Sequence, residues 1–298
     1  MRFIRPTIFS PSMLISSNVP ENDYAEWVAG TYPKGTRKIL AATHMIYEVL
    51  TTTTADSPLD GLAKETPTWM VVSFTNKYKM FDDVIGTQTT NPLKVDVVMR
   101  PGTVVNSLAL FNLSGKSVTI TVTDPVEGIV FNRKISLISA GVDNWYDWFF
   151  EDIDYRTNVV VLDMPAYGTA DIRVVVESAG TAAVGILING KLQAIGTALW
   201  EASVGIDDYS RKVRDPTFGT MTVVQRSFSD VGDFPIQVET IRIDKIKKML
   251  TEIRATPVVW IAEEKYESTI IYGFYKTFRF PFSSPDFSQG AISIEGVI

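Results

Sequence analysis

The sequence alternates apolar and hydroxyl side chains without interruption in Ser117-Val118-Thr119-Ile120-Thr121-Val122-Thr123. A period of two predicts a β-strand with one buried face and one threonine-lined face open to solvent. Further runs of strand length between residues 67 and 198 are rich in β-branched and aromatic residues: Thr68–Phe74, Leu93–Arg100, Ser107–Phe111, Val159–Asp163, Asp171–Glu177 and Ala182–Ile188. Because turn residues separate most of these strands and no convincing helix interrupts them, we expect a central β-sandwich with jelly-roll or galactose-binding-like topology.

The region after residue 198 has a different pattern, in which one helix lies among strands. Apolar residues recur every three or four positions from Ile243 to Arg254, and Pro257 prevents the helix from continuing. Strands are predicted at Thr220–Phe228 and in three apolar segments after the helix: Pro257–Ile261, Ser268–Phe280 and Ala291–Ile298. We therefore expect an α+β segment over residues 199–298, in which the helix packs across a small antiparallel sheet.

Composition excludes several classes of protein. A net charge of −6 argues against a main surface that binds nucleic acid. The absence of cysteine removes thiolate chemistry, and the single histidine, His44, excludes metal sites that need two. No apolar run is long enough to span a bilayer, and Pro6 and Pro11 interrupt any signal-peptide core. We expect no catalytic residues, no bound metal and no cofactor, and synthesis in a cytoplasm.

Residues 1–66 are expected to form a small N-terminal aromatic β module that ends in a polar linker. Trp27, then Tyr32 before the glycine turn at Gly35, and then Tyr47 give an order similar to that of small chitin-binding-type modules. The resemblance implies that these rings stack on sugar faces. The alternative is that the same rings form the minimal core of the module.

Carboxylates and aromatic rings cluster just before the later strands of the sandwich. Three rings, Trp145, Tyr146 and Trp148, lie among Asp147, Asp152 and Asp154. The rings would anchor this loop against the sandwich or a neighbouring subunit, or they would bind a sugar. The acids would otherwise hold calcium or act as a glycosidase pair.

A resemblance to a known family covers the chain from about Thr68 to its end, and it is strongest after Ser203. Its motifs are Val204-Gly205-x-x-Asp208-Tyr209-Ser210-Arg211-Lys212, Arg254-Ala255-Thr256-Pro257-Val258-Val259-Trp260-Ile261, Tyr272-Gly273-Phe274-Tyr275 and a terminal Ile-Glu-Gly-Val-Ile. The sequence resembles tail-associated structural proteins of tailed bacteriophages and prophages, which are often labelled as carrying a carbohydrate-binding domain. The residues expected to serve assembly are Asp208, Tyr209, Arg211, Lys212, Arg254, Trp260, Tyr272 and Phe274.

The resemblance implies a non-enzymatic virion protein of the phage tail or tail tip, assembled in the bacterial cytoplasm. Its partners would be other tail proteins, further copies of the chain in a rotationally symmetric oligomer, and a host surface glycan or receptor-binding fibre. Two alternatives remain, a free-standing carbohydrate-binding module and a glycan-degrading enzyme. If the C-terminal segment serves docking, deleting Ser203–Ile298 abolishes incorporation into particles, whereas substituting Trp145 and Trp148 spares assembly.

Overall fold

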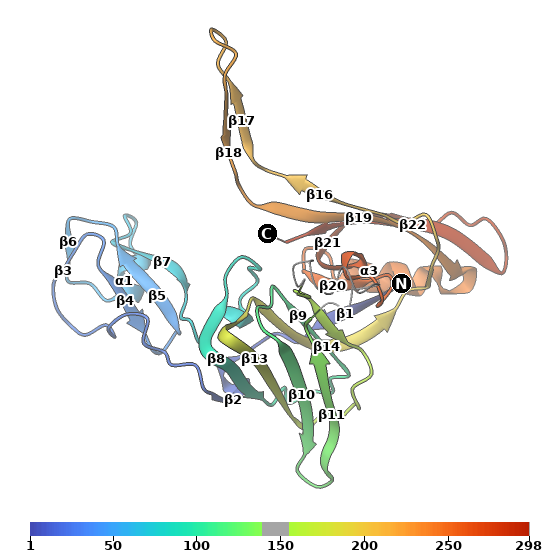
Figure 1. The fold of residues 1–298 in the computed structure, drawn as a ribbon, viewed down its shortest axis with the longest axis horizontal. Coiled ribbons are helices and arrows are strands. Elements are labelled where there is room, and N and C mark those ends of the chain that lie inside the picture. Colours follow the sequence, from blue (N-terminus) through green and yellow to red (C-terminus); the bar gives the residue numbers. More distant parts are fainter. Residues whose placement is uncertain (139–154, 298) are drawn as a thin grey trace, which may run out of the picture.

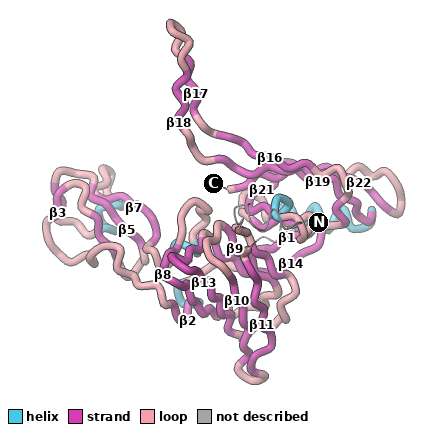
Figure 2. Tube along the Cα trace, in the orientation of Figure 1, coloured by secondary structure: helices cyan, strands magenta, loops and turns pink. Residues whose placement is uncertain are grey.

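The computed structural model describes residues 1–138 and 155–297. The chain is mostly β, with a few short helices, and the predicted β-sandwich and C-terminal helix are both present (Figure 2). No helix of the described ranges is long and apolar enough to cross a bilayer.

The strands and helices have the following bounds. The strands before residue 139 are β1 Arg2–Pro6, β2 Leu14–Ser17, β3 Tyr32–Pro33, β4 Arg37–Leu40, β5 Met45–Val49, β6 Thr53–Thr54, β7 Trp69–Phe74, β8 Thr89–Met99, β9 Ser107–Phe111, β10 Ser117–Asp124 and β11 Gly128–Ser136. Those that follow are β12 Val159–Val161, β13 Asp171–Val184, β14 Ile186–Ala194, β15 Thr197–Ala198, β16 Ser203–Asp208, β17 Arg211–Arg214, β18 Met221–Val224, β19 Phe228–Glu239, β20 Val258–Ile261, β21 Ile270–Arg279 and β22 Phe287–Gly296. The α-helices are α1 Pro58–Leu62 and α3 Ile243–Glu252.

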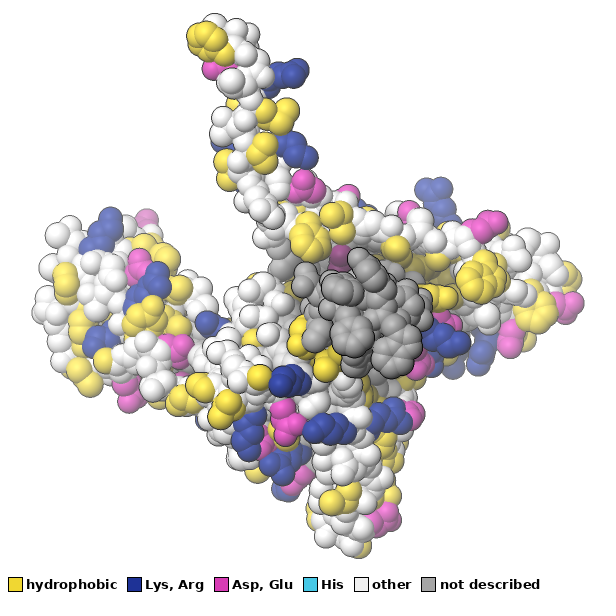
Figure 3. Space-filling model, viewed as in Figure 1, with side chains coloured by type: hydrophobic (Ala, Val, Ile, Leu, Met, Phe, Trp, Pro, Cys, Tyr) yellow, Lys and Arg dark blue, Asp and Glu magenta, His cyan; other side chains and the backbone are white. Residues whose placement is uncertain are grey.

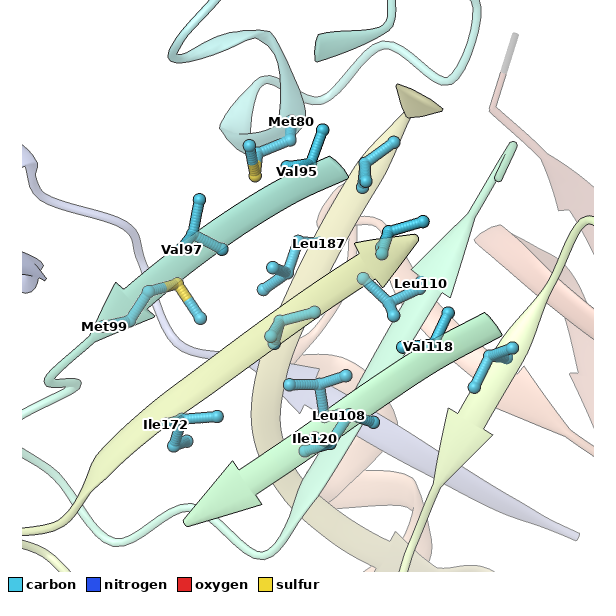
Figure 4. Close-up of a cluster of buried hydrophobic side chains, with 14 of the residues drawn as sticks. Met80, Val95, Val97, Met99, Leu108, Leu110, Val118, Ile120, Ile172 and Leu187 are labelled. Carbon is cyan, nitrogen blue, oxygen red and sulfur yellow. The ribbon is translucent and has the colours of Figure 1, made fainter. Parts of the chain in front are cut away.

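The sandwich forms between a five-stranded sheet and one end of a ten-stranded sheet. The smaller sheet has the order β11-β10-β13-β8-β2, and it faces the β12-β9-β14 end of the larger one (Figure 1). Val118 and Ile120 of β10 point into the shared core, where they meet Leu108, Leu110 and Leu187 of the larger sheet (Figure 4). Val122 belongs to the same buried cluster. The other face of β10 carries the more exposed threonines, as the alternation predicts.

The chain passes from one sheet of the sandwich to the other at Gly185. The run Ala182–Ile188, expected as one strand, is therefore the end of β13 and the start of β14. A Cβ atom at Gly185 would lie 2.9 Å from the carbonyl oxygen of Phe111, so glycine permits the close approach of backbone at this corner. Strand β11 was not predicted; it lies at a sheet edge, where none of its side chains is fully buried and the alternation is weak.

Strand β1 does not belong to an N-terminal module. It lies in the ten-stranded sheet between β14 and β20, with Phe3 opposite Gln193 on one side and Trp260 on the other. Strand β2 joins the sandwich by pairing with β8. The first 20 residues therefore connect to the main body, and the region expected after residue 198 shares its sheet with both β1 and β14.

Helix α3 packs across the C-terminal part of the ten-stranded sheet, as its periodicity predicts. Ile246 and Leu250 are buried against Phe234, Trp260 and Ile292 of the sheet. The Tyr275 hydroxyl donates a hydrogen bond to the Leu250 carbonyl at 3.0 Å, which fastens the end of the helix to β21.

The N-terminal module is a small unit that lies beside the two large sheets (Figure 1). It contains the three-stranded sheet β4-β5-β7, the short pair β3-β6 and helix α1. Because β7 pairs with β5, the module extends beyond residue 66, where its end was expected. Its buried core is small and consists of Tyr47, Val49 and Trp69.

Candidate functional site

A two-stranded hairpin projects away from the body of the protein (Figure 1), and we refer to residues 209–227 as the β-arm. Strands β16 and β19 pair within the ten-stranded sheet from Ser203 opposite Asp233 to Asp208 opposite Phe228. Beyond that last pair the chain continues outward as β17 and β18, which pair only with each other. The β-arm therefore extends a sheet edge into solvent.

The tip of the β-arm is closed by a tight turn around Asp215. Its carboxylate accepts hydrogen bonds from the backbone N–H groups of Thr217 at 2.7 Å and Phe218 at 3.1 Å. These two donors hold the pKa of the Asp215 carboxyl below its usual range. Gly219 adopts a φ of 68°, which a residue with a side chain rarely adopts, and its N–H donates to the Asp215 carbonyl at 2.9 Å.

Polar contacts fix the base of the β-arm to the body. The Tyr209 hydroxyl donates to a carboxylate oxygen of Glu295 at 3.2 Å. Lys276 lies 3.6 Å from Asp207 and 3.4 Å from the same Glu295 carboxylate. The arm therefore leaves the sheet at a braced position rather than from a loose loop.

The β-arm exposes apolar side chains that nothing in the described chain covers. These side chains, with their exposed fractions, are Val213 (44%), Phe218 (81%), Met221 (57%), Val223 (56%) and Val224 (50%). Figure 3 shows hydrophobic and basic side chains interleaved along the arm. An isolated two-stranded hairpin is marginally stable in water, and contiguous exposed apolar surface is typical of interaction sites. The arm therefore presents an exposed apolar surface of the kind that interaction sites have.

The β-arm also differs from the rest of the chain in charge. It carries four basic side chains and one acidic one, a net charge of +3. The whole chain has a net charge of −6, so the remaining residues carry −9. Opposite net charges on the arm and on the body favour contact between the arm and an acidic surface.

The residues expected to serve assembly do not form one surface. Asp208 and Tyr209 lie at the base of the β-arm, and Arg211 and Lys212 lie on it, all four exposed. Trp260 is fully buried, and its indole N–H donates to the Gly273 carbonyl at 3.0 Å. The remaining residues of the set lie elsewhere in the C-terminal region: Arg254 is exposed just after α3, Tyr272 is buried in β21, and Phe274 is 37% exposed in β21.

The aromatic residues of the N-terminal module pack together instead of forming an open platform. Tyr47 is buried, while Trp27 and Tyr32 pack against the core that Tyr47 and Trp69 form. The Tyr32 hydroxyl donates to the Val28 carbonyl at 2.6 Å. This arrangement matches the minimal-core interpretation. The candidate residues Trp145, Tyr146 and Trp148, with Asp147, Asp152 and Asp154, lie outside the described residues.

A concavity of about 420 Å³ lies where the N-terminal module meets the body, and we call it the junction pocket. Its walls include two pairs of stacked rings, Phe9 on Phe81 and His44 on Tyr78, each with ring centroids 4.0 Å apart. Asp82 lines the same pocket, and burial raises the pKa of its carboxyl. Aromatic rings can stack on the face of a sugar, and a carboxylate beside them can accept hydrogen bonds from the sugar's hydroxyl groups.

Sequence reasoning missed the exposed residues on the outer part of the β-arm, from Val213 to Val224, and also Trp200. The sequence signal for the arm was the turn from Pro216 to Gly219, which lies just before the expected strand Thr220–Phe228 and was not interpreted as the tip of a hairpin. Trp200 stands in no periodic pattern. Comparisons with protein-family models, with curated proteins and with solved structures gave no match.

Proposed function

We propose that the protein is a non-enzymatic structural component of a bacteriophage tail or tail tip, which joins neighbouring subunits through the β-arm. The observation that carries this proposal is the arm itself, a braced hairpin with exposed apolar side chains and a basic charge. The arm begins in the motif from Val204 to Lys212, where the sequence resembles phage tail-associated proteins. The resemblance also supports a place in the virion tail, after synthesis in the bacterial cytoplasm.

The structure suggests a precise way to remove the β-arm. Asp208 and Phe228 are Cα partners at the end of the β16–β19 ladder, so a two-residue Asn-Gly turn can replace residues 209–227 without moving either strand. We expect this arm-trimmed variant to fold and to be missing from particles, whereas the wild-type chain is present. Mass spectrometry of purified particles from phage carrying each version measures incorporation.

A matched control keeps the length of the chain and its fold. Lys247→Glu changes one exposed charge on α3, far from the arm in sequence, and is expected to leave incorporation unchanged. The proposal fails if the wild-type chain is missing from particles, or if the arm-trimmed variant is incorporated as well as the wild type.

A second candidate function is carbohydrate binding at the junction pocket. The stacked rings beside Asp82 support it, and it would give the virion protein a contact with a host glycan or make the chain a free-standing carbohydrate-binding module. Wild-type protein and a Phe81→Ala variant on a glycan array test this function. It requires a glycan that binds the wild type and is lost in the variant; no binding by the wild type removes it.

A further inference from the structure

A groove of about 590 Å³ lies where β15 meets the N-terminus and the loop after β20, and we call it the Trp200 groove. Two of its aromatic side chains are largely in solvent, Trp200 with 86% and Tyr266 with 54% of its surface exposed. Glu201, the next residue, adopts a φ of 73°, which side-chain-bearing residues rarely adopt. The loop thus holds a large indole outward in a strained backbone, a feature that clusters at binding sites.

The Trp200 groove is acidic. Glu201 and Glu263 line it, and neither forms an ion pair with any described residue. Arg2, the basic side chain of the lining, is already paired with Glu264. Burial lowers the pKa of the Met1 amino group to about 6, so this group carries little charge at neutral pH. Two carboxylates and two exposed aromatic rings therefore face the solvent together.

One face of the β-arm offers the complementary set. Lys212 lies opposite Val223, and Arg214 lies opposite Met221, in the antiparallel register of β17 and β18. Because cross-strand partners share a face, these four side chains lie together. Lys212 makes only an exposed pair with Asp208 at 3.4 Å, which is weak enough to exchange for another carboxylate. The two basic and two apolar side chains on this face of the arm are therefore complementary to the two carboxylates and two aromatic rings of the Trp200 groove.

We propose that the β-arm of one copy of this chain docks, through the face of Lys212, Arg214, Met221 and Val223, into the Trp200 groove of a second copy. The proposal rests on the assembly function above and names the partner surface. Charge complementarity selects the occupant, because a basic arm and an acidic groove are carried by the same chain.

The geometry of β16 favours a second copy over docking within one chain. This strand starts at Ser203, next to the groove, and runs extended to Asp208, where the arm begins. Six residues of strand span about 20 Å, and the nine residues to the tip add about 30 Å. The arm therefore leads away from its own groove. A docked pair keeps one free groove, on the copy that gives its arm, and one free arm, on the copy that receives it, so this head-to-tail contact closes into a ring or extends as a filament.

Complementation between two variants tests the proposal in solution. The arm-trimmed variant keeps its groove, and a Trp200→Ala/Glu263→Lys variant keeps its arm. We expect the wild type, a chain of 33.1 kDa, to form oligomers, each variant alone to be a monomer, and their equimolar mixture to give a heterodimer with the summed mass of the two variants, by mass photometry. A wild type that stays monomeric, a groove variant that still oligomerises, or a mixture that stays monomeric overturns the proposal.

Charge reversal provides an independent test. Arg214→Glu alone and Glu263→Lys alone are each expected to weaken self-association about tenfold or more, and combining both changes in one chain is expected to restore it, because every docked arm and groove then carries the reversed pair. Thermal unfolding confirms that each variant is folded, and Lys247→Glu serves as the control for a remote change of charge. No recovery in the double variant contradicts the pairing of Arg214 with Glu263.

The two proposals fail in different ways. If the groove variant is incorporated into particles normally while the arm-trimmed variant is not, the assembly function holds and the arm binds a different protein. If the wild-type chain is missing from particles, the assembly function fails whatever the solution measurements show.

Discussion

Phe3 should contribute to the stability of the C-terminal half of the protein, although it lies at the opposite end of the sequence. Its side chain is fully buried, and its ring centroid lies 5.4 Å from that of Trp260 in the core that helix α3 covers. Replacing a buried phenylalanine with alanine costs about 3–5 kcal/mol, because the transfer free energy is lost and a cavity remains. Against a typical unfolding free energy of about 5–15 kcal/mol, Phe3→Ala removes about a fifth or more of the stability.

Urea denaturation combined with hydrogen exchange by mass spectrometry checks this prediction and locates the effect. Faster exchange is expected in peptides from α3 and β20, whereas peptides from β4 to β7 of the N-terminal module should exchange as in the wild type. Ile8→Ala is the matched control, because Ile8 is 89% exposed in the same N-terminal segment and its loss should change stability by at most about 0.5 kcal/mol. A loss below about 1 kcal/mol for Phe3→Ala, or faster exchange in the module instead, would refute the placement of β1 in the large sheet.

Three further predictions concern other parts of the fold. Trp69→Ala should destabilise the N-terminal module by about 3–5 kcal/mol, since Trp69 is fully buried there, and exchange should accelerate in β5 and β7 but not in β19 to β22. Arg173 donates two hydrogen bonds to Asp96 and holds the pKa of that carboxyl below its usual range. The stability that this ion pair contributes is present above the unfolded pKa of about 3.9 and is lost as pH falls through the lower folded pKa. Asp96→Asn should therefore lower the free energy of unfolding at pH 7, and it should make that free energy fall less steeply as the solution is acidified. A Cβ at Gly273 would lie 2.0 Å from the Glu295 carbonyl oxygen, so Gly273→Ala should cost about 1–3 kcal/mol in thermal unfolding, whereas Gly86→Ala, with no heavy atom within 4 Å, should not destabilise.

The regular spacing of apolar residues was enough to predict the strands and helices that bury one face. The alternation of β10 and the three- and four-residue spacing of α3 each follow from one face packing on a core, so both appear in the sequence. The pairing of strands that are far apart in the sequence produces no such periodic pattern. Strand β1 is five residues long, and its neighbours β14 and β20 lie more than 180 residues further along the chain. The placement of β1 therefore became visible only in the structure.

Only part of the candidate site could be predicted from the sequence, and the reason is related. Aromatic density marks surfaces that are buried, but it does not say whether the chain's own core or a partner buries them. Trp260 and Trp200 illustrate this ambiguity, since the first is fully buried and the second is 86% exposed. The motif from Asp208 to Lys212 does lie at the arm, because its charges and turn residues need solvent. Trp200 follows no periodic pattern, and only its exposure identifies it.

The continuity of the ten-stranded sheet decides which deletion can test assembly. Removing Ser203–Ile298 would take away β19 to β22 and the side chain of Trp260 against which Phe3 packs, so the remaining chain would lose the core under α3. Failure of such a truncation to enter particles would report unfolding as readily as lost docking. The β-arm alone can be removed between the Cα partners Asp208 and Phe228, where the ladder is already closed. Because β17 and β18 contribute no buried side chain, a loss of assembly in that variant would have to come from the surface of the arm.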